Sequence, residues 1–112
     1  MTAAPPSSPR RFSSAADDLH LGDDIVVVPA VRKDDGGPMS AYTAHFPAGA
    51  RADLPAPYTE VWVVLRGALC VGTGTDSVVV RAGEFVHVPE QAAGTVEALE
   101  PTTLVCVSAP AH

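Results

Sequence analysis

The run Tyr-Thr-Glu-Val-Trp-Val-Val-Leu-Arg-Gly, residues 58–67, decides the fold class of this chain. Its centre is rich in valine and holds a tryptophan, and β-branched and aromatic side chains favour strands. Gly67 ends the run, because glycine lets the chain turn where other residues resist. Side chains along a strand alternate between two faces, so Glu60 shares its face with Tyr58 and Trp62. The other face of this predicted strand is apolar.

Further short strands are predicted on both sides of this run. Residues 24–31 are rich in β-branched side chains, and Pro29 within them indicates an edge position. The remaining predicted strands are 39–46, 68–73, 77–81, 84–88, 95–99 and 102–108, with a turn at 74–76 and an irregular segment over 51–57. Strands spaced about ten residues apart with turns between them are typical of a sandwich or small barrel. The predicted fold class is therefore all-β.

Length and composition narrow the function. The chain has 112 residues, with 11 Pro and 9 Gly, which is enough for one domain and excludes a two-domain enzyme. The net charge is -6 with only 7 Lys and Arg, so we expect no nucleic-acid partner, since phosphate binding needs a basic face. No apolar run approaches the roughly 20 residues of a membrane span, so we expect no membrane partner.

The first 18 residues differ from the rest of the chain. They are mostly Pro, Ser, Ala and Arg, and such a segment cannot bury enough apolar surface to order itself. We therefore predict a flexible tail over 1–18 and a single barrel over 19–112. Arg10 and Arg11 have no apolar segment behind them, as an export signal would require. Cys70 and Cys106 lack metal or redox spacing and suit a reducing compartment, so we expect a cytoplasmic protein.

Two spacings go beyond a generic β pattern. The first places Gly49, Glu60 and Gly67 in order, and the second is the run Gly-Glu-Phe-Val-His-Val-Pro at residues 83–89. These resemble the two sequence motifs of the cupin superfamily, and the resemblance covers residues 26–108. It implies a cupin-type double-stranded β-helix, also called a jelly-roll barrel.

The resemblance also implies a metal site, which this sequence does not reproduce. Typical cupins bind a divalent metal with a His-x-His pair, a Glu and a fourth His. Residues 53–57 stand at the pair's position without a histidine, Gly94 takes the place of the fourth ligand, and only Glu60 is kept. One carboxylate does not hold a transition metal, so we expect no cofactor. One alternative stays open, an irregular divalent-metal site rebuilt from Asp53 with His45 or His87.

Among cupins, the chain is similar to metal-poor members resembling the ethanolamine-utilisation cupin. Those members also lack the histidine pair and carry a Tyr-Asp-Glu sequence before the strand. This chain has Tyr58, Thr59 and Glu60 there, with threonine in place of the aspartate.

The predicted catalytic residues are Glu60 and His87. A carboxyl group facing a cavity beside Trp62 would lose solvent, the condition under which such groups act as general acids or bases near neutral pH. An inward His87 would complete an acid–base pair with it. The alternatives are a Glu60 bonded to backbone amides and a His87 that only builds the wall.

Four further residues are candidates for binding the substrate. Tyr58 and Trp62 would form a flat wall with polar tips. His45 is a weaker candidate, since its neighbours suggest that it faces away, and Arg66 could bind a carboxylate at the barrel mouth. A solvated surface charge is the alternative for the arginine.

Three functions fit these residues. The first is an enzyme acting on a small organic molecule inside a metal-free barrel by acid–base chemistry, of isomerase, cyclase, lyase or dehydratase type, in specialised metabolism. The second is a non-catalytic ligand-binding or sensor cupin, and the third a structural subunit with a filled barrel. We expect a homodimer in each case, formed through the strand at 24–31 and the outward side chains of Val61, Val63 and Leu65.

Overall fold

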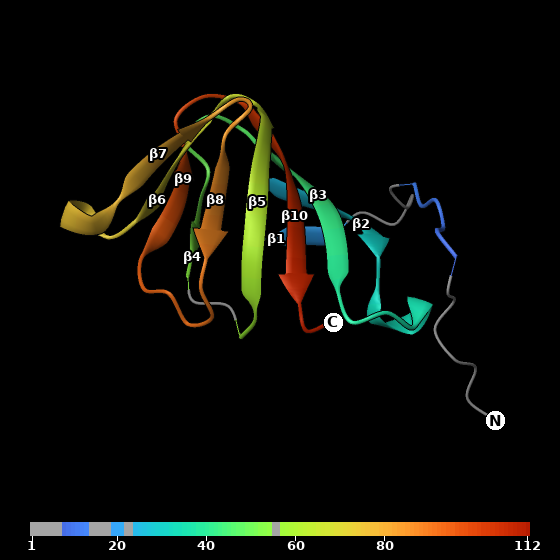
Figure 1. Cartoon of the computed structure of the whole chain (residues 1–112). Coiled ribbons are helices and arrows are strands. Elements are labelled where there is room, and N and C mark those ends of the chain that lie inside the picture. Colours follow the sequence, from blue (N-terminus) through green and yellow to red (C-terminus); the bar gives the residue numbers. More distant parts are fainter. Residues whose placement is uncertain (1–7, 14–18, 22–23, 55–56) are drawn as a thin grey trace.

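The computed structural model describes residues 8–13, 19–21, 24–54 and 57–112, and nearly all of its regular structure is strand (Figure 1). The elements in chain order are β1 (Leu19–Leu21), β2 (Ile25–Val31), η1 (Lys33–Asp35), β3 (Ser40–Phe46), β4 (Arg51–Asp53), β5 (Thr59–Arg66), β6 (Ala68–Gly72), η2 (Gly74–Asp76), β7 (Val78–Arg81), β8 (Phe85–Val88), β9 (Thr95–Ala98) and β10 (Thr102–Ala109). The all-β prediction is confirmed.

The strands form two antiparallel sheets. The larger sheet has the order β1-β2-β3-β10-β5-β8 and the smaller one the order β4-β9-β6-β7. Figure 1 shows β5, β10 and β3 side by side, with the smaller sheet beyond β8. Each sheet joins strands far apart in sequence, as in a jelly roll.

The core lies between the sheets and follows from alternation. In β5 the residues Glu60, Trp62 and Val64 are buried while Val61 and Leu65 are exposed, as the sequence predicts. The remaining buried apolar side chains come from both sheets and include Ile25, Ala44, Phe46, Leu69, Val71, Val80, Val88, Val96, Ala98, Leu104 and Cys106. Valine and alanine dominate this set, so the interior is filled by small side chains.

The predicted irregular segment at 51–57 is partly a strand. Residues Arg51–Asp53 form β4, which pairs with β9 through Ala52 opposite Val96. Arginine and aspartate do not favour strands, so local sequence gives no sign of β4. Its pairing with a distant strand imposes the conformation. The short strand β1 was likewise not predicted, and it pairs with the first half of β2.

The proline in β2 fits its position. Strand β1 pairs with Ile25, Val26 and Val27 only, so Pro29 lies beyond the end of the neighbouring strand. The pairing of β2 with β3 shifts register just after Pro29. A residue without an N–H is tolerated where the ladder is open or irregular. The edge position that Pro29 predicted is therefore correct for this half of β2.

Gly67 is required at the turn between β5 and β6. Its φ of +95° is in the left-handed region, and a Cβ there would collide with the carbonyl oxygen of Pro101 and the side chain of Thr102. The Thr102 hydroxyl also accepts from the Ala68 amide at 3.1 Å and is buried. The turn is thus packed directly against the start of β10.

The predicted flexible tail falls partly outside the described residues, which omit 1–7 and 14–18. Within residues 8–13, the Arg10 guanidinium donates to the Asp35 carbonyl at 2.8 Å and lies 5.0 Å from the ring centre of Phe12. Among the described residues, no helix is long and apolar enough to cross a membrane.

Candidate functional site

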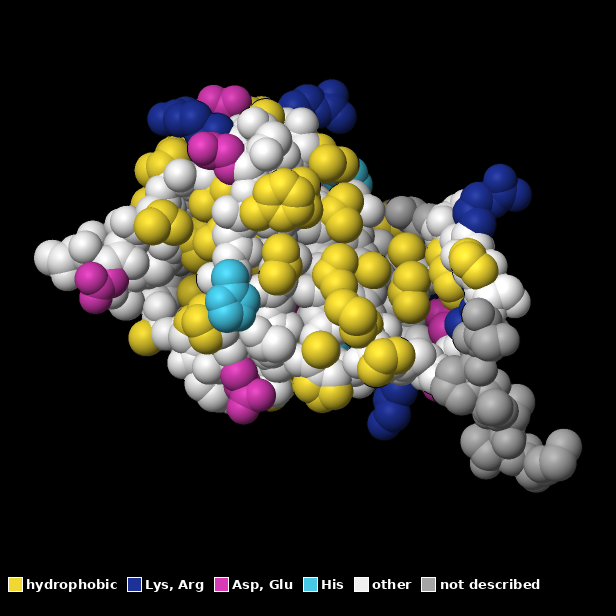
Figure 2. Space-filling view, viewed as in Figure 1, with side chains coloured by type: hydrophobic (Ala, Val, Ile, Leu, Met, Phe, Trp, Pro, Cys, Tyr) yellow, Lys and Arg dark blue, Asp and Glu magenta, His cyan; other side chains and the backbone are white. Residues whose placement is uncertain are grey.

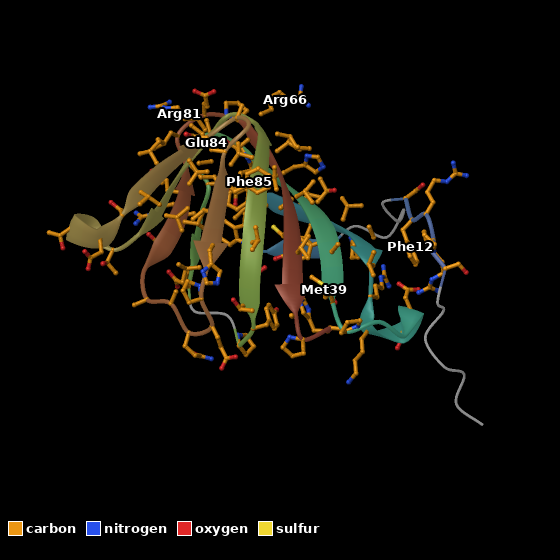
Figure 3. The ribbon with its side chains drawn as sticks, in the orientation of Figure 1. Phe12, Met39, Arg66, Arg81, Glu84 and Phe85 are labelled. Carbon is orange, nitrogen blue, oxygen red and sulfur yellow. The ribbon has the colours of Figure 1, made fainter. Side chains whose placement is uncertain are left out.

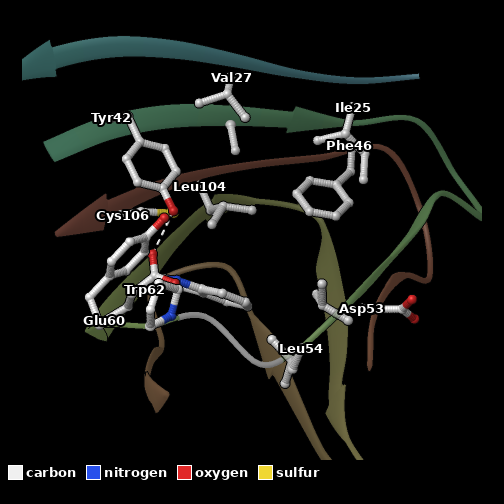
Figure 4. A pocket seen from close by; sticks show the side chains of 14 residues that line it. Ile25, Val27, Tyr42, Phe46, Asp53, Leu54, Glu60, Trp62, Leu104 and Cys106 are labelled. Atoms are coloured by element: carbon white, nitrogen blue, oxygen red, sulfur yellow. Dashed lines mark hydrogen bonds between the residues drawn. The ribbon is translucent and has the colours of Figure 1, made fainter. Parts of the chain in front are cut away.

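A cavity of about 260 Å³ opens between the two sheets, and we call it the barrel pocket (Figure 4). Its lining is mostly apolar, with a few polar side chains among the aromatic and aliphatic ones. The lining residues are Ile25, Val27, Tyr42, Ala44, Phe46, Asp53, Leu54, Pro57, Tyr58, Glu60, Trp62, Val96, Leu104 and Cys106. The barrel is therefore not filled by its own side chains.

Glu60 and Tyr42 form the polar centre of the barrel pocket. Glu60 on β5 is 4% exposed, and the Tyr42 hydroxyl on β3 donates to its Oε1 at 2.5 Å. Strand β10 lies between these two strands and presents Cys106 and Ser108 at this level. Because both are small, the tyrosine ring can reach over β10 to the carboxylate (Figure 4).

The tyrosine keeps its proton across the neutral range. Burial raises the pKa of the Tyr42 phenol far above its ordinary value, and the neighbouring Cys106 and Glu60 add to the effect. Tyr42 is therefore a fixed donor that leaves the second oxygen of Glu60 for other partners. Burial also raises the pKa of the Cys106 thiol, with Glu60 adding to it and the hydrogen bond from Tyr42 opposing it. Cys106 is an inert wall residue at neutral pH, as its sequence context suggests.

Trp62 lines the pocket with its ring and holds a buried donor that has no partner among the described residues. Its side chain is 5% exposed and lies on the same face of β5 as Glu60. Among the buried polar side-chain atoms of the described residues, only its indole Nε1 lacks a hydrogen-bond partner. A buried donor without an acceptor is costly, and this one exposes almost no surface to the pocket or to solvent.

Tyr58 lines the pocket and is held by an unexpected partner. Its ring stacks on the imidazole of His112, with the ring centres 3.8 Å apart and the planes 3° from parallel. His112 Nε2 lies 2.7 Å from the Ser108 hydroxyl, and its backbone amide donates to Ser40 at 2.8 Å. Burial and nearby Glu60 raise the pKa of Tyr58. His112 lies near the end of the described residues, and the structure packs it against the site.

His87 does not meet Glu60. In the pairing of β5 with β8, Val88 stands opposite Glu60 and His87 opposite the exposed Val61. Paired residues share a face, so His87 points outward, where its Nε2 lies 3.0 Å from the Thr59 hydroxyl. A shift of one residue along β8 separates the two predicted catalytic residues. The partner of Glu60 is therefore Tyr42 and not the predicted His87.

His45 and Arg66 lie together, but away from the barrel pocket. Both are exposed and line a separate shallow hollow of about 330 Å³, which we call the outer hollow. His45 Nδ1 is 3.2 Å from the Thr103 hydroxyl, and Thr103 is paired with Arg66 across β10 and β5. Figure 3 shows Arg66 at the end of its strand, pointing away from the sheet. Neither side chain can contact a ligand beside Glu60.

The residues present do not fit the metal that typical cupins hold. Glu60 is bonded to Tyr42, Asp53 is an exposed residue of β4, and His45 and His87 point to the outside. In the part of the chain that the structure describes, no three His, Cys, Asp or Glu side chains are grouped to hold a metal ion. A site rebuilt from these residues would need them to converge, which they do not.

Tyr42 is the site residue that sequence reasoning missed. Its place in an alternating strand with Ala44 and Phe46 indicates an inward direction, which the structure shows. What the sequence lacks is the register of β3 against β10, which sets Tyr42 opposite Cys106. With that register, an inward-facing tyrosine opposite a small cross-strand residue would have indicated that Tyr42 reaches Glu60.

The comparison with known proteins shows the fold. No protein-family model matches the chain, and no curated protein matches it in sequence. Among solved structures, an RmlC-like cupin from Shewanella frigidimarina has a TM-score of 0.75 and 18% identity, covering 93% of this chain and 94% of the other. Ectoine synthase from P. lautus has a TM-score of 0.74 and 16% identity, and the match covers 84% of this chain and 69% of the synthase.

Ethanolamine utilization protein Q of Salmonella typhimurium LT2 has a TM-score of 0.73 and 22% identity, covering 79% of this chain and 71% of that protein. One of these proteins is named as an enzyme and the names of the other two state no reaction, so the shared fold leaves the chemistry open. The chain has the fold of a small RmlC-like cupin.

Proposed function

We propose that this protein is an enzyme that moves a proton on a small organic molecule held in the barrel pocket. The observation that carries the proposal is the buried Glu60 carboxyl group, fixed by Tyr42 at 2.5 Å and facing a cavity of about 260 Å³. Isolated buried carboxyl groups are costly and concentrate at functional sites. Isomerisation, cyclisation, dehydration and decarboxylation all use such a proton shuttle.

In this proposal Glu60 is the acid–base residue and Tyr42 orients it. The tyrosine hydroxyl occupies Oε1, so Oε2 takes a proton from the substrate and returns it at a second position. Trp62 and Tyr58 hold the substrate against the carboxyl group. The proposed proton transfer needs no metal, and the described residues do not group to hold one.

A ligand-binding or sensor cupin is the second candidate. The observation that favours it is that the described pocket residues besides Glu60 offer few titratable groups: an exposed Asp53 on β4, and tyrosines and a thiol that keep their protons. Such a protein would bind the same molecules without changing them. The two free thiols agree with the expectation of a cytoplasmic protein in either case.

Solvent exchange tests the proposal without knowledge of the natural substrate. An enzyme that shuttles protons exchanges substrate hydrogen for deuterium even where no net product forms. Small cyclic ketones and lactones would be incubated with the protein in D₂O, and deuterium incorporation followed by proton NMR. We expect exchange above background for at least one compound that binds.

Three variants assign the exchange to the site. Glu60→Gln should lower the rate by at least about 100-fold, the usual contribution of a positioned acid–base group. Tyr42→Phe should lower it less, since it only orients the carboxyl group. His87→Gln on the outer face should leave it unchanged. Binding without exchange, or full exchange by Glu60→Gln, would overturn the enzymatic proposal and favour the ligand-binding cupin.

A further inference from the structure

We infer that His112 is a positioning residue of the barrel pocket: its imidazole holds the Tyr58 ring in place as the pocket wall beside Glu60, and so strengthens ligand binding. The inference rests on the proposed function, in that the barrel pocket is taken as the place where ligands bind. Three observations carry it: the stack of the two rings, the slight attachment of Tyr58 to the rest of the described chain, and the firm attachment of His112.

The Tyr58 side chain has little else to fix the direction of its ring. It lies in the bend before β5, and the first ladder pair of that strand joins Thr59 to Ala109. The Tyr58 hydroxyl makes no hydrogen bond with a described residue. Tyr42, by contrast, is fixed both by its strand and by its bond to Glu60. The orientation of Tyr58 therefore depends on what lies against the face of its ring.

The imidazole of His112 lies flat against that face. The ring centres of His112 and Tyr58 are 3.8 Å apart and the planes are 3° from parallel, so the two rings overlap closely. The same imidazole packs edge to face with Tyr42, with the ring centres 6.5 Å apart and the planes at 73°. Aromatic rings at such separations attract each other. His112 therefore supports both of the tyrosines that line the pocket.

His112 is itself fixed to the larger sheet. Its backbone amide donates to the Ser40 hydroxyl at 2.8 Å, that hydroxyl donates to the His112 carbonyl at 3.0 Å, and Nε2 lies 2.7 Å from the Ser108 hydroxyl. Ser40 and Ser108 are paired across β3 and β10, and both are buried. The Ala111 amide adds a bond to the Pro38 carbonyl at 3.0 Å. Moving His112 would leave buried hydroxyl groups without partners, so its ring is a firm support.

This support lies at the level of Glu60. Ser108 is paired with Ser40 on one side and with Glu60 on the other, so three buried polar side chains form one row across β3, β10 and β5. Burial, and next the charge of Glu60, raise the pKa of Tyr58, so the phenol lies within reach of that charge. His112 is exposed and does not line the pocket. It therefore acts on a ligand through the tyrosine.

Two variants of His112 separate its ring from its hydrogen bond. His112→Phe keeps a flat aromatic ring against Tyr58 and loses the nitrogen that meets Ser108. His112→Gln has no ring, but its amide places a polar group the same number of bonds from the backbone as Nε2. If the ring positions Tyr58, only His112→Gln should disturb the pocket. His87→Gln on the outer face is the control for a histidine away from the site.

Cyclohexanone is the probe, and its affinity is measured from backbone amide shifts in NMR titrations. We expect His112→Gln to weaken cyclohexanone binding about fivefold, while His112→Phe and His87→Gln stay within about twofold of the unaltered protein. Deuterium exchange at saturating cyclohexanone should change little in His112→Gln, because Glu60 and Tyr42 remain. A stacked ring also shifts its partner's resonances upfield, so the Tyr58 ring protons should move downfield in His112→Gln only. The chain has two tyrosines, so Tyr58→Phe assigns these resonances.

The possible results separate this inference from the proposed function. Unchanged cyclohexanone binding in His112→Gln, or equal weakening in both His112 variants, would overturn the inference alone. The expected binding pattern without deuterium exchange would overturn only the enzymatic proposal. If cyclohexanone does not bind the unaltered protein up to its solubility limit, both conclusions fail. Should His112→Gln not fold, the unaltered protein decides: cyclohexanone should shift the ring resonances of both Tyr58 and His112, and an unmoved His112 would overturn the inference.

Discussion

At the scale of single residues, the hydrogen bond from Tyr42 to Glu60 links the stability of the protein to its site. Tyr42→Phe removes the donor and leaves a buried carboxyl oxygen without its partner. We expect the free energy of unfolding to fall by about 1–3 kcal/mol, measured by urea denaturation at neutral pH. Tyr58→Phe is the matched control, since the Tyr58 hydroxyl makes no hydrogen bond with a described residue, and the loss of stability should be smaller. Equal losses would argue that the bond to Glu60 contributes nothing.

Alkaline pH should destabilise the folded chain through two buried groups. Burial raises the pKa of both Tyr42 and Cys106, whose ordinary values are 10.0 and 9.0. In the unfolded chain they ionise at these ordinary values, whereas the folded chain keeps both protons. Their stabilising effect is therefore complete below about pH 9 and is lost as the pH rises, by about 1.4 kcal/mol per pH unit for each group.

Denaturation at a series of pH values from 8 to 11 measures this loss. Cys106→Val should make the decline in unfolding free energy shallower from about pH 9 upward, and Tyr42→Phe from about pH 10 upward. A decline that stays the same in both variants would show that other groups cause it.

The residues of the site were predictable from sequence only in part. Alternation placed Glu60 and Trp62 on one face of a strand, the cupin resemblance implied that this face points inward, and the structure agrees. The partner of Glu60 was not predictable, because it depends on how separate strands align. His87 and Tyr42 both lie on strands, and one residue of register decides which of them reaches the carboxyl group.

At the scale of elements, the turn at Gly67 joins the two sheets. Gly67→Ala would both force a side chain into the left-handed region and push its Cβ into Pro101 and Thr102. Gly83→Ala is the matched control, because Gly83 has a φ of +86° but open space where a Cβ would lie. The control should cost about 1–2 kcal/mol, the penalty of the backbone conformation alone.

Thermal and urea unfolding of the two variants give the contribution of the contact. We expect Gly67→Ala to lose at least twice as much free energy of unfolding as Gly83→Ala, or to fail to fold. Similar losses in both would mean that the start of β10 moves aside without cost.

Elements were predictable where composition and pairing agree. The valine-rich strands β2 and β5 were evident, whereas β4 was not, because its Arg-Ala-Asp sequence has no strand preference. Strand β4 exists because β9 offers it backbone partners. Asp53 reaches the pocket through this pairing, so local sequence could not show its position.

At the scale of the whole molecule, the outer face of the larger sheet is largely uncharged. Two rows of paired residues cross β3, β10, β5 and β8 on this face: Thr43, Val105, Val63 and Phe85, and Ala41, Val107, Val61 and His87. Figure 2 shows hydrophobic side chains gathered over these strands, and Figure 3 shows Phe85 among them. Phe85 is 69% exposed, a large apolar side chain in contact with water.

We propose that a second copy of this chain covers that face. Each copy carries a net charge of -6, so two copies repel except where they meet through surfaces without acidic groups. The two rows contain no Asp, Glu, Lys or Arg, and they include Val61 and Val63, which the sequence already suggested for a twofold contact.

Sedimentation velocity at micromolar concentration tests the dimer. The unaltered protein should sediment as a dimer, and Phe85→Glu should shift it to a monomer. Val79→Glu on the other sheet is the matched control, since Val79 is 46% exposed and lies outside the proposed contact. A monomeric unaltered protein, or a dimer that survives Phe85→Glu but not Val79→Glu, would contradict the proposal.

The position of β10 has a consequence for the order in which the protein can be made. This strand follows all the others of the described residues, lies in the middle of the larger sheet between β3 and β5, and passes beneath the bond that joins Tyr42 to Glu60. During synthesis on the ribosome, β3 and β5 have no strand to pair with between them until residues 102–109 have emerged. Incompletely folded chains with unpaired strand edges are especially prone to aggregate. We therefore expect the demand for chaperones to persist until residues 102–109 have emerged, and the barrel pocket to be assembled only at that moment.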